Sequence, residues 1–149
     1  MSNHYFDKYC FESDPRLLRR IAEALVDSVP TNTQVLAGLE LGGVPLATML
    51  SQVTGLPAVF VRKAPKSYGS CRLAEGCEIV GRRLLVVEDV VTSGGQVLES
   101  AQALRALGGE VSAALCVIDR ESGGAALLAA EGIELHPLFR MSELEEAAA

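Results

Sequence analysis

The stretch Leu84-Leu85-Val86-Val87-Glu88-Asp89-Val90-Val91-Thr92-Ser93-Gly94-Gly95 joins an apolar run, two adjacent acids and a turn of small residues. The apolar run predicts a buried strand over residues 84–87, and the amphipathic segment 96–107 predicts a helix directly after the turn. A turn between a strand and a helix N-terminus presents backbone N–H groups that can bind an anion. The Thr-Ser pair adds hydroxyl donors, and the Gly-Gly pair lets the backbone approach a ligand closely.

The acids Glu88 and Asp89 are expected at the carboxyl end of this strand, where open α/β sheets bind their ligands. Carboxylates can accept hydrogen bonds from sugar hydroxyls, while the amides of the turn can bind a phosphate. The combination therefore suits a sugar phosphate. The alternative is an ordinary strand–helix turn, because such turns often contain Asp and Gly, although they seldom place a Glu-Asp pair before them.

Strands and helices alternate along the chain, which favours a Rossmann-like α/β fold, a parallel sheet flanked by helices on both faces. The predicted strands cover residues 34–38, 58–61, 84–87, 111–118 and 133–139. The predicted helices are one that begins at Asp14-Pro15 and ends at Pro30, then 42–53, 96–107 and 124–130, and a short acidic C-terminal helix capped by Ser142. With 149 residues and no linker or internal repeat, we expect a single domain over residues 1–149.

Composition narrows the classes of function. The net charge of −6 argues against nonspecific binding to nucleic acids or anionic membranes. No apolar run reaches the roughly 18–20 residues of a membrane span, and the N-terminus lacks a signal-peptide pattern. The four cysteines form no C-x-x-C pair, which disfavours a zinc site and suggests a reduced, cytoplasmic protein. Cys116 lies in an apolar strand and is expected in the core.

Residues 63–80 lack a clean period and predict a long loop, and such loops are often functional lids or disordered segments. Basic side chains are concentrated at its start, in an otherwise acidic chain. Mobile cations that close over an anionic group could stabilise its charge and exclude water. The alternative is a solvated basic loop. The residues concerned are Arg62, Lys63, Lys66 and Arg72, together with Tyr68.

Two further strand–helix turns contain candidate ligand groups. In Gly38-Leu39-Glu40-Leu41-Gly42-Gly43-Val44-Pro45, the glycines can turn backbone N–H groups onto an anion, although Gly-Gly-x-Pro is common in such turns. In Asp119-Arg120-Glu121-Ser122-Gly123-Gly124, the Arg follows a strand and can bind a carboxylate through two hydrogen bonds. An Arg that pairs with a nearby acid is the alternative there.

The stretch 84–95 resembles the phosphoribosyl-pyrophosphate (PRPP) motif of the type I phosphoribosyltransferases, with two apolar residues, Glu-Asp, two apolar residues and Thr-Ser-Gly. The segment 38–45 is similar to the pyrophosphate loop of that family, and Asp-Arg-x-x-Gly-Gly at 119–124 is similar to its orotate subfamily. The resemblance spans nearly the whole chain. It implies a type I phosphoribosyltransferase core with a flexible lid loop, and an enzyme, a glycosyltransferase, that converts PRPP and orotate to orotidine 5′-monophosphate and pyrophosphate in pyrimidine biosynthesis.

The resemblance also implies roles for individual residues. The catalytic set is Lys66, Asp89, Lys63 and Arg62. The substrate-binding set is Glu88, Asp89, Val90, Val91, Thr92, Ser93, Gly94, Gly95, Tyr68, Arg120, Tyr5, Phe6 and Gly42. Mg²⁺ is the implied cofactor, bound mainly to PRPP oxygens and water, so no protein metal ligand is expected.

The implied assembly is a homodimer in which the lid loop of one subunit reaches the neighbouring site. Orotate enzymes usually have a further helix and strand before the Tyr5-Phe6-Asp7 segment, so the resemblance also suggests a shortened N-terminus. Two other functions stay open. One is a phosphoribosyltransferase for another base, of the purine salvage type, and the other is a noncatalytic regulator that senses PRPP or a nucleotide.

Overall fold

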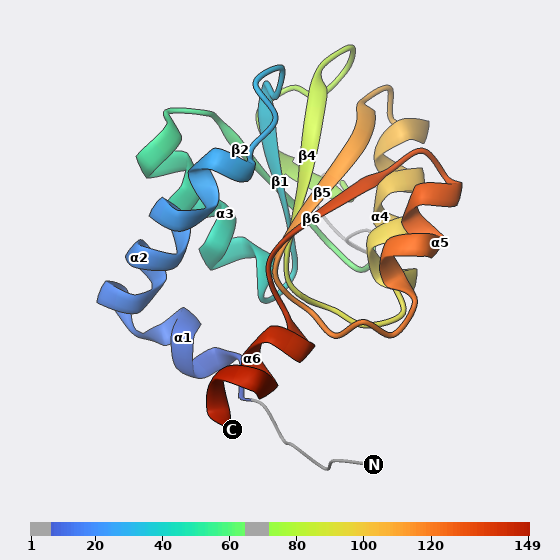
Figure 1. Ribbon diagram of the computed structural model, residues 1–149. Helices are drawn as coiled ribbons and strands as arrows, with labels where there is room; N and C mark the ends of the chain where they lie inside the picture. The colour runs from blue at the N-terminus through green and yellow to red at the C-terminus, as the bar shows by residue number, and fades with distance from the viewer. Residues whose placement is uncertain (1–6, 65–71) are drawn as a thin grey trace.

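The computed structural model describes residues 7–64 and 72–149. The strands are β1 (Val35–Leu39), β2 (Ala58–Val61), β3 (Ala74–Gly76), β4 (Arg83–Val91), β5 (Glu110–Asp119) and β6 (Glu134–Arg140). The helices are α1 (Tyr9–Ser13), α2 (Pro15–Leu25), the 3₁₀ turn η1 (Val26–Ser28), α3 (Gly43–Thr54), α4 (Gly95–Ala106), α5 (Gly124–Ala130) and α6 (Met141–Ala148). Together they confirm the predicted α/β fold, a central sheet with helices on both faces (Figure 1).

The sheet has the strand order β3-β2-β1-β4-β5-β6. All neighbouring strands are parallel except β2 and β3, which pair antiparallel. After β1 the chain adds β2 toward one edge of the sheet, and after β4 it adds β5 toward the opposite edge. The direction of winding therefore reverses between β1 and β4, and the carboxyl ends of these two strands form the place where such sheets bind ligands.

Each face of the sheet has its own apolar core, because successive residues of a strand point to opposite faces. On one face, α1, α2 and α3 contribute Phe11, Leu18 and Leu46 to a cluster with Leu85. On the other face, Leu104 of α4 and Leu128 of α5 form a second cluster with side chains of the sheet, which include Val86 of β4 and Cys116 of β5. The predicted burial of Cys116 is confirmed. In the described residues, no helix is long and apolar enough to cross a membrane.

Strand β4 is longer than the sequence predicts, since it runs to Val91 rather than ending at Val87. Its ladder with β5 continues through the acids, with Glu88 opposite Cys116 and Val91 opposite Asp119. Glu88 and Asp89 therefore lie within the last part of the strand rather than after it. Val90 and Val91 pair with β5, so the strand continues beyond the two acids, where the sequence predicted its end.

Three other elements differ from the predicted ones. The predicted loop 63–80 contains β3, an edge strand paired with β2. The helix that Asp14 caps, through bonds to the N–H groups of Arg16 and Leu17, ends at Leu25 and continues as a 3₁₀ turn. Ser142 does not cap the last helix with its side chain; instead its N–H donates a 2.8 Å hydrogen bond to the Glu121 carboxylate.

Two glycines allow α3 to lie close to the sheet. A Cβ on Gly38 would lie 2.6 Å from the carbonyl oxygen of Gly43 and 2.7 Å from the Cβ of Ala47. A Cβ on Gly43 would overlap the carbonyl oxygen of Val87 in β4. The loop between β1 and α3 therefore approaches the end of β4 only because these positions lack side chains.

We predict that Gly38→Ala lowers the free energy of unfolding by about 1–3 kcal/mol, the usual cost of overpacking a well-packed interior. Gly95→Ala is the matched control, because a Cβ there meets nothing closer than Ser93 Oγ at 3.7 Å. Urea unfolding of both variants checks this expectation. Equal stability of the two variants would contradict the close packing of α3 on β1.

Candidate functional site

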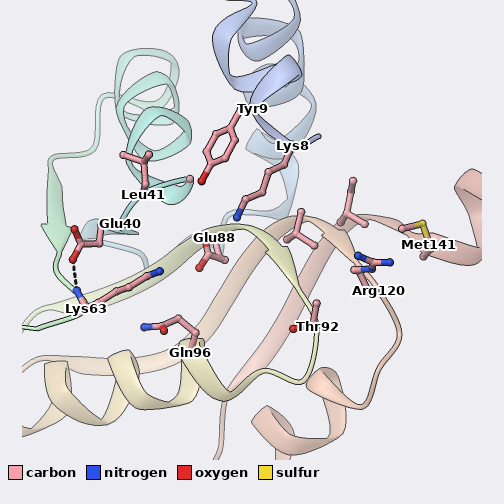
Figure 2. A pocket seen from close by; sticks show the side chains of 13 residues that line it. Lys8, Tyr9, Glu40, Leu41, Lys63, Glu88, Thr92, Gln96, Arg120 and Met141 are labelled. Carbon is pink, nitrogen blue, oxygen red and sulfur yellow. Dashed lines mark hydrogen bonds between the residues drawn. The ribbon is translucent and has the colours of Figure 1, made fainter. Parts of the chain in front are cut away.

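A cavity of about 440 Å³ opens at the carboxyl ends of the central strands, at the point where the winding of the sheet reverses. Figure 2 shows side chains from α1, from the loops after β1 and β2, and from the ends of β4 and β5 around it. Its lining residues are Lys8, Tyr9, Glu40, Leu41, Gly42, Lys63, Glu88, Val90, Thr92, Gln96, Ile118, Arg120 and Met141.

The turn after β4 forms a second, smaller cavity of about 150 Å³. Val91, Thr92, Ser93, Gly94 and Gly95 line it, and Glu88, Val90, Thr92 and Gln96 line both cavities. The turn leads directly into α4, so the cavity lies at a helix N-terminus, where the helix dipole favours an anion. The part of the sequence predicted to bind phosphate is therefore contiguous with the larger pocket.

Gly94 has a structural reason to be glycine. Its φ is +86°, and a Cβ there would lie 3.0 Å from the Cα of Gly124 at the start of α5. The turn after β4 thus packs against α5 on one side, while a Cβ on Gly95 would meet only Ser93 Oγ, at 3.7 Å. A side chain can be added to the cavity wall at Gly95 but not at Gly94 without strain.

The two acids of β4 point to opposite faces of the sheet and differ in their surroundings. Glu88 lines both cavities. Asp89 is fully buried and lines neither, although it was predicted to face the substrate. Asp89 Oδ1 accepts a 2.7 Å hydrogen bond from the Val90 N–H, and the Asp89 N–H donates a 3.0 Å bond to Glu88 Oε1.

The second oxygen of Asp89 faces α1 and the loop before α3. The ammonium nitrogen of Lys8 lies 3.0 Å from Asp89 Oδ2. A Cβ on Gly42 would overlap the Asp89 carboxylate and would lie 2.8 Å from Glu12 Oε1, so Gly42 must be glycine for the loop to lie there. Lys8 and Glu12 are functional-site neighbours that the sequence analysis missed. Their spacing of one helical turn was the available signal, but it does not indicate a partner in β4.

The pKa values follow from this clustering of acids. Burial, and then the neighbouring Asp89 carboxylate, raises the pKa of Glu12 to about 8 and the pKa of Glu88 to about 8. Burial alone would also raise the pKa of Asp89, but the neighbouring carboxyl groups of Glu88 and Glu12, the Lys8 ammonium and the Val90 N–H outweigh it and hold that pKa below its ordinary value. Asp89 is therefore the acid of this cluster that ionises most readily, and Lys8 pairs with its carboxylate.

Cations lie on two sides of Glu88. Lys63 lines the pocket on one side, and its backbone N–H donates a hydrogen bond to the Glu40 carboxylate. Arg120 lies on the other side (Figure 2), where its own N–H donates a 2.9 Å bond to the carbonyl of Val91. Arg62, predicted to act beside Lys63, lines an adjoining cavity of about 280 Å³ and not the main pocket.

Four of the predicted residues, Tyr5, Phe6, Lys66 and Tyr68, lie outside the described residues. Among the described residues, Tyr9 at the start of α1 lines the pocket, and Leu41 and Met141 add apolar surface. Within residues 7–64 and 72–149, no three His, Cys, Asp or Glu side chains form a group able to hold a metal ion.

Comparisons with known proteins agree with this geometry. A family model of the phosphoribosyl transferase domain matches residues 13–130. The orotate phosphoribosyltransferase of a Nocardioides species is 51% identical over 146 residues, which are 98% of this chain and 82% of that protein. The orotate phosphoribosyltransferase of Halobacterium salinarum is 44% identical over 146 residues, which are 98% of this chain and 83% of that protein.

A solved structure indicates the same family. The crystal structure of Mycobacterium tuberculosis H37Rv orotate phosphoribosyltransferase in complex with PRPP superposes with a TM-score of 0.83 and 31% sequence identity. The match covers 95% of this chain and 83% of that chain. With a family model over most of its length and relatives of this similarity, the chain belongs to the orotate phosphoribosyltransferases of the phosphoribosyl transferase domain family.

Proposed function

We infer that this protein transfers the phosphoribosyl group of PRPP to orotate, which gives orotidine 5′-monophosphate and pyrophosphate in pyrimidine nucleotide biosynthesis. One observation carries this inference. A pocket contiguous with the phosphate-binding turn contains Arg120, a cation suited to the carboxylate that distinguishes orotate from uracil. The relatives' names and the structure of the M. tuberculosis enzyme with PRPP support both substrates.

The arrangement suggests where each part of PRPP binds. The 5′-phosphate suits the turn 92–95 at the start of α4, and Glu88 is placed to accept hydrogen bonds from the ribose hydroxyls. Pyrophosphate suits the side of the pocket with Lys63 and Gly42, and orotate the side with Arg120. When pyrophosphate departs, positive charge develops on the sugar and negative charge on the leaving group. Fixed carboxylates and cations on those two sides stabilise both charges.

Residues outside the main pocket have proposed roles as well. Asp89 is proposed to contribute its negative charge from its buried position next to Glu88. Arg62, Lys66 and Tyr68 belong to the segment proposed to cover pyrophosphate. Tyr5 and Phe6 are proposed to cover the base. The single domain of residues 1–149 is proposed to act as a homodimer in the cytoplasm, with the segment around Lys66 serving the neighbouring site. Free cysteines such as Cys10 and Cys77 are compatible with a reducing compartment.

Mg²⁺ is proposed as the cofactor, held by PRPP oxygens and water. Mg²⁺ keeps several waters and binds through phosphates, which supports a cation that arrives with its substrate. When bound, it supplies charge neutralisation for pyrophosphate. The residues of the chain bind and orient PRPP around it.

The first test is an assay of pyrophosphate release with PRPP, Mg²⁺ and one base at a time. We expect turnover with orotate and little with uracil, because uracil leaves the Arg120 cation without a partner in the pocket. Faster turnover of adenine or hypoxanthine would favour a purine salvage enzyme. Binding of PRPP in calorimetry without turnover of any of these bases would favour the regulator.

We predict that Arg120→Ala lowers kcat/KM for orotate by about 10²-fold or more, the scale of losing a charge-assisted pair of hydrogen bonds. The affinity for PRPP, measured by calorimetry, should change little, because PRPP contacts other turns. Arg19→Ala is the control, since this exposed Arg of α2 pairs only with Glu23 among the described side chains. A parallel loss of orotate use and PRPP affinity would remove Arg120 from base recognition.

We predict that Gly95→Val weakens PRPP binding by about tenfold or more, roughly the loss of one hydrogen bond, because the new side chain narrows the cavity after β4. Gly95 is the informative position, since a Cβ there meets no atom closer than 3.7 Å and the fold should be kept. Calorimetry measures the affinity, and thermal unfolding verifies the fold. Unchanged affinity in a folded variant would mean that phosphate does not bind at this turn.

A further inference from the structure

The N-terminal helix α1 and Lys8, the N-cap residue directly before it, direct two side chains at the same buried carboxylate. Lys8 and Glu12 are four residues apart and therefore lie on one face of the helix. Lys8 Nζ lies 3.0 Å from Asp89 Oδ2. A Cβ on Gly42 would overlap Asp89 Oδ2 and lie 2.8 Å from Glu12 Oε1, so the two carboxyl groups lie together on one side of Gly42. Figure 2 shows that Lys8 and Tyr9 extend from α1 toward Glu88, so this contact lies at the wall of the pocket.

The charges in this cluster do not balance if all the acids are ionised. Three carboxyl groups, those of Glu12, Glu88 and Asp89, share one ammonium group, that of Lys8. Like charges in contact in a buried site strongly disfavour the doubly ionised state. Both oxygens of Glu12 are shielded from solvent, and among the described residues no donor hydrogen-bonds to either of them. An ionised Glu12 would therefore be a buried anion facing another anion.

We propose that Glu12 is a positioning residue for the phosphoribosyl site, which in its protonated form donates a hydrogen bond to the Asp89 carboxylate and so holds α1 against the loop before α3. Lys8 neutralises the charge that remains on Asp89. The inference deepens the proposed function and rests on it for its activity readouts. Glu12 does not line the pocket, and it acts on the reaction only through Asp89, Gly42 and the pocket residues Lys8 and Tyr9 of its own helix.

Loss of this proton has a predictable mechanical effect. Ionised Glu12 and Asp89 would repel each other across Gly42, and α1 would move away from the pocket together with Lys8 and Tyr9. The groups that set the titration are Lys8 on α1, and Asp89 and, behind it, Glu88 on β4. The loop before α3 contributes only the backbone of Gly42 at this contact. The other charged groups that line the pocket are Glu40, Lys63 and Arg120, and the interactions that set the pKa of Glu12 do not include them.

The first experiment measures stability against pH for wild type, Glu12→Gln and the control Glu23→Gln. Since the pKa of Glu12 in the folded protein, about 8, lies above the ordinary value of 4.5, the folded state holds this proton more tightly than the unfolded state. The wild type therefore loses stability as pH rises from about 4.5 to about 8, while Gln, a neutral isostere of the protonated acid, does not titrate. The Tm of Glu12→Gln relative to wild type should rise across this window.

Glu23→Gln is the control for the effect of removing a carboxylate elsewhere on the protein. Glu23 is exposed and pairs with Arg19, so Glu23→Gln should show no such rise relative to wild type. If Glu12 instead acts as an ionised partner of Lys8, Glu12→Gln loses stability relative to wild type as pH rises through the acid range, and the proposal is overturned. This experiment needs no substrate, so it stands even if orotate turnover is not found.

The second experiment measures KM for PRPP and kcat between pH 6.5 and 9 in the orotate assay. At pH 7, Glu12→Gln should stay within about twofold of wild type, and Glu12→Ala should raise KM for PRPP about threefold or more, because only Gln replaces the donor to Asp89. Toward pH 9, KM should rise less in Glu12→Gln than in wild type. Equal KM values for the Gln and Ala variants across this range would overturn the positioning role, whereas lack of wild-type turnover would count against the proposed function alone.

Discussion

Asp89 carries a charge at a position that solvent does not reach, and a buried charge persists only where nearby groups compensate it. Its compensation comes from two parts of the chain: the Val90 N–H of its own strand, and the N-terminal segment with the Lys8 ammonium and the proposed Glu12 carboxyl proton. These contacts join the N-terminal helix to the end of β4, and the loop before α3 lies beside them because Gly42 has no side chain. The wall of the pocket on this side therefore depends on the charge of Asp89.

The strand order explains why this charge lies at the pocket. β1 and β4 are neighbours, and their following helices cover opposite faces of the sheet, so the loops after them diverge and leave an opening between them. The loop after β1 can approach β4 only because Gly38, Gly42 and Gly43 have no side chains. Glycines in that segment therefore serve close packing first, and any contact of their N–H groups with an anion is a consequence of that packing.

The sequence was sufficient for the fold and for the residues of the local motifs. The hydrophobic patterns predicted the parallel strands. Of the candidate ligands recognised in the sequence, Glu88, the turn 92–95 and Arg120 lie around one pair of contiguous cavities, whereas Asp89 lines neither. Long-range contacts were not predictable. Nothing in the segment around Lys8 and Glu12 indicates a partner in β4, and the separation of Arg62 from the main pocket depends on how β2 ends beside β3. The extent of β4 was underestimated because ladder pairing with β5 outweighs the polarity of the acids.

The distribution of charge in the pocket relates the fold to the chemistry. The protein is acidic, with a net charge of −6, yet its pocket places cations at two sides of an acidic side chain: Lys63 lies on one side, Arg120 on the other, and Glu88 between them (Figure 2). Phosphoribosyl transfer generates a cationic sugar between a departing anion and an incoming anionic base, so each charge of the reacting groups would face a pocket group of opposite sign. Fixed groups stabilise such a state only if they need not reorganise as it forms. The backbone contacts of Lys63 and Arg120, to Glu40 and to Val91, keep both cations at the ends of strands β2 and β5, so the sheet itself maintains their separation.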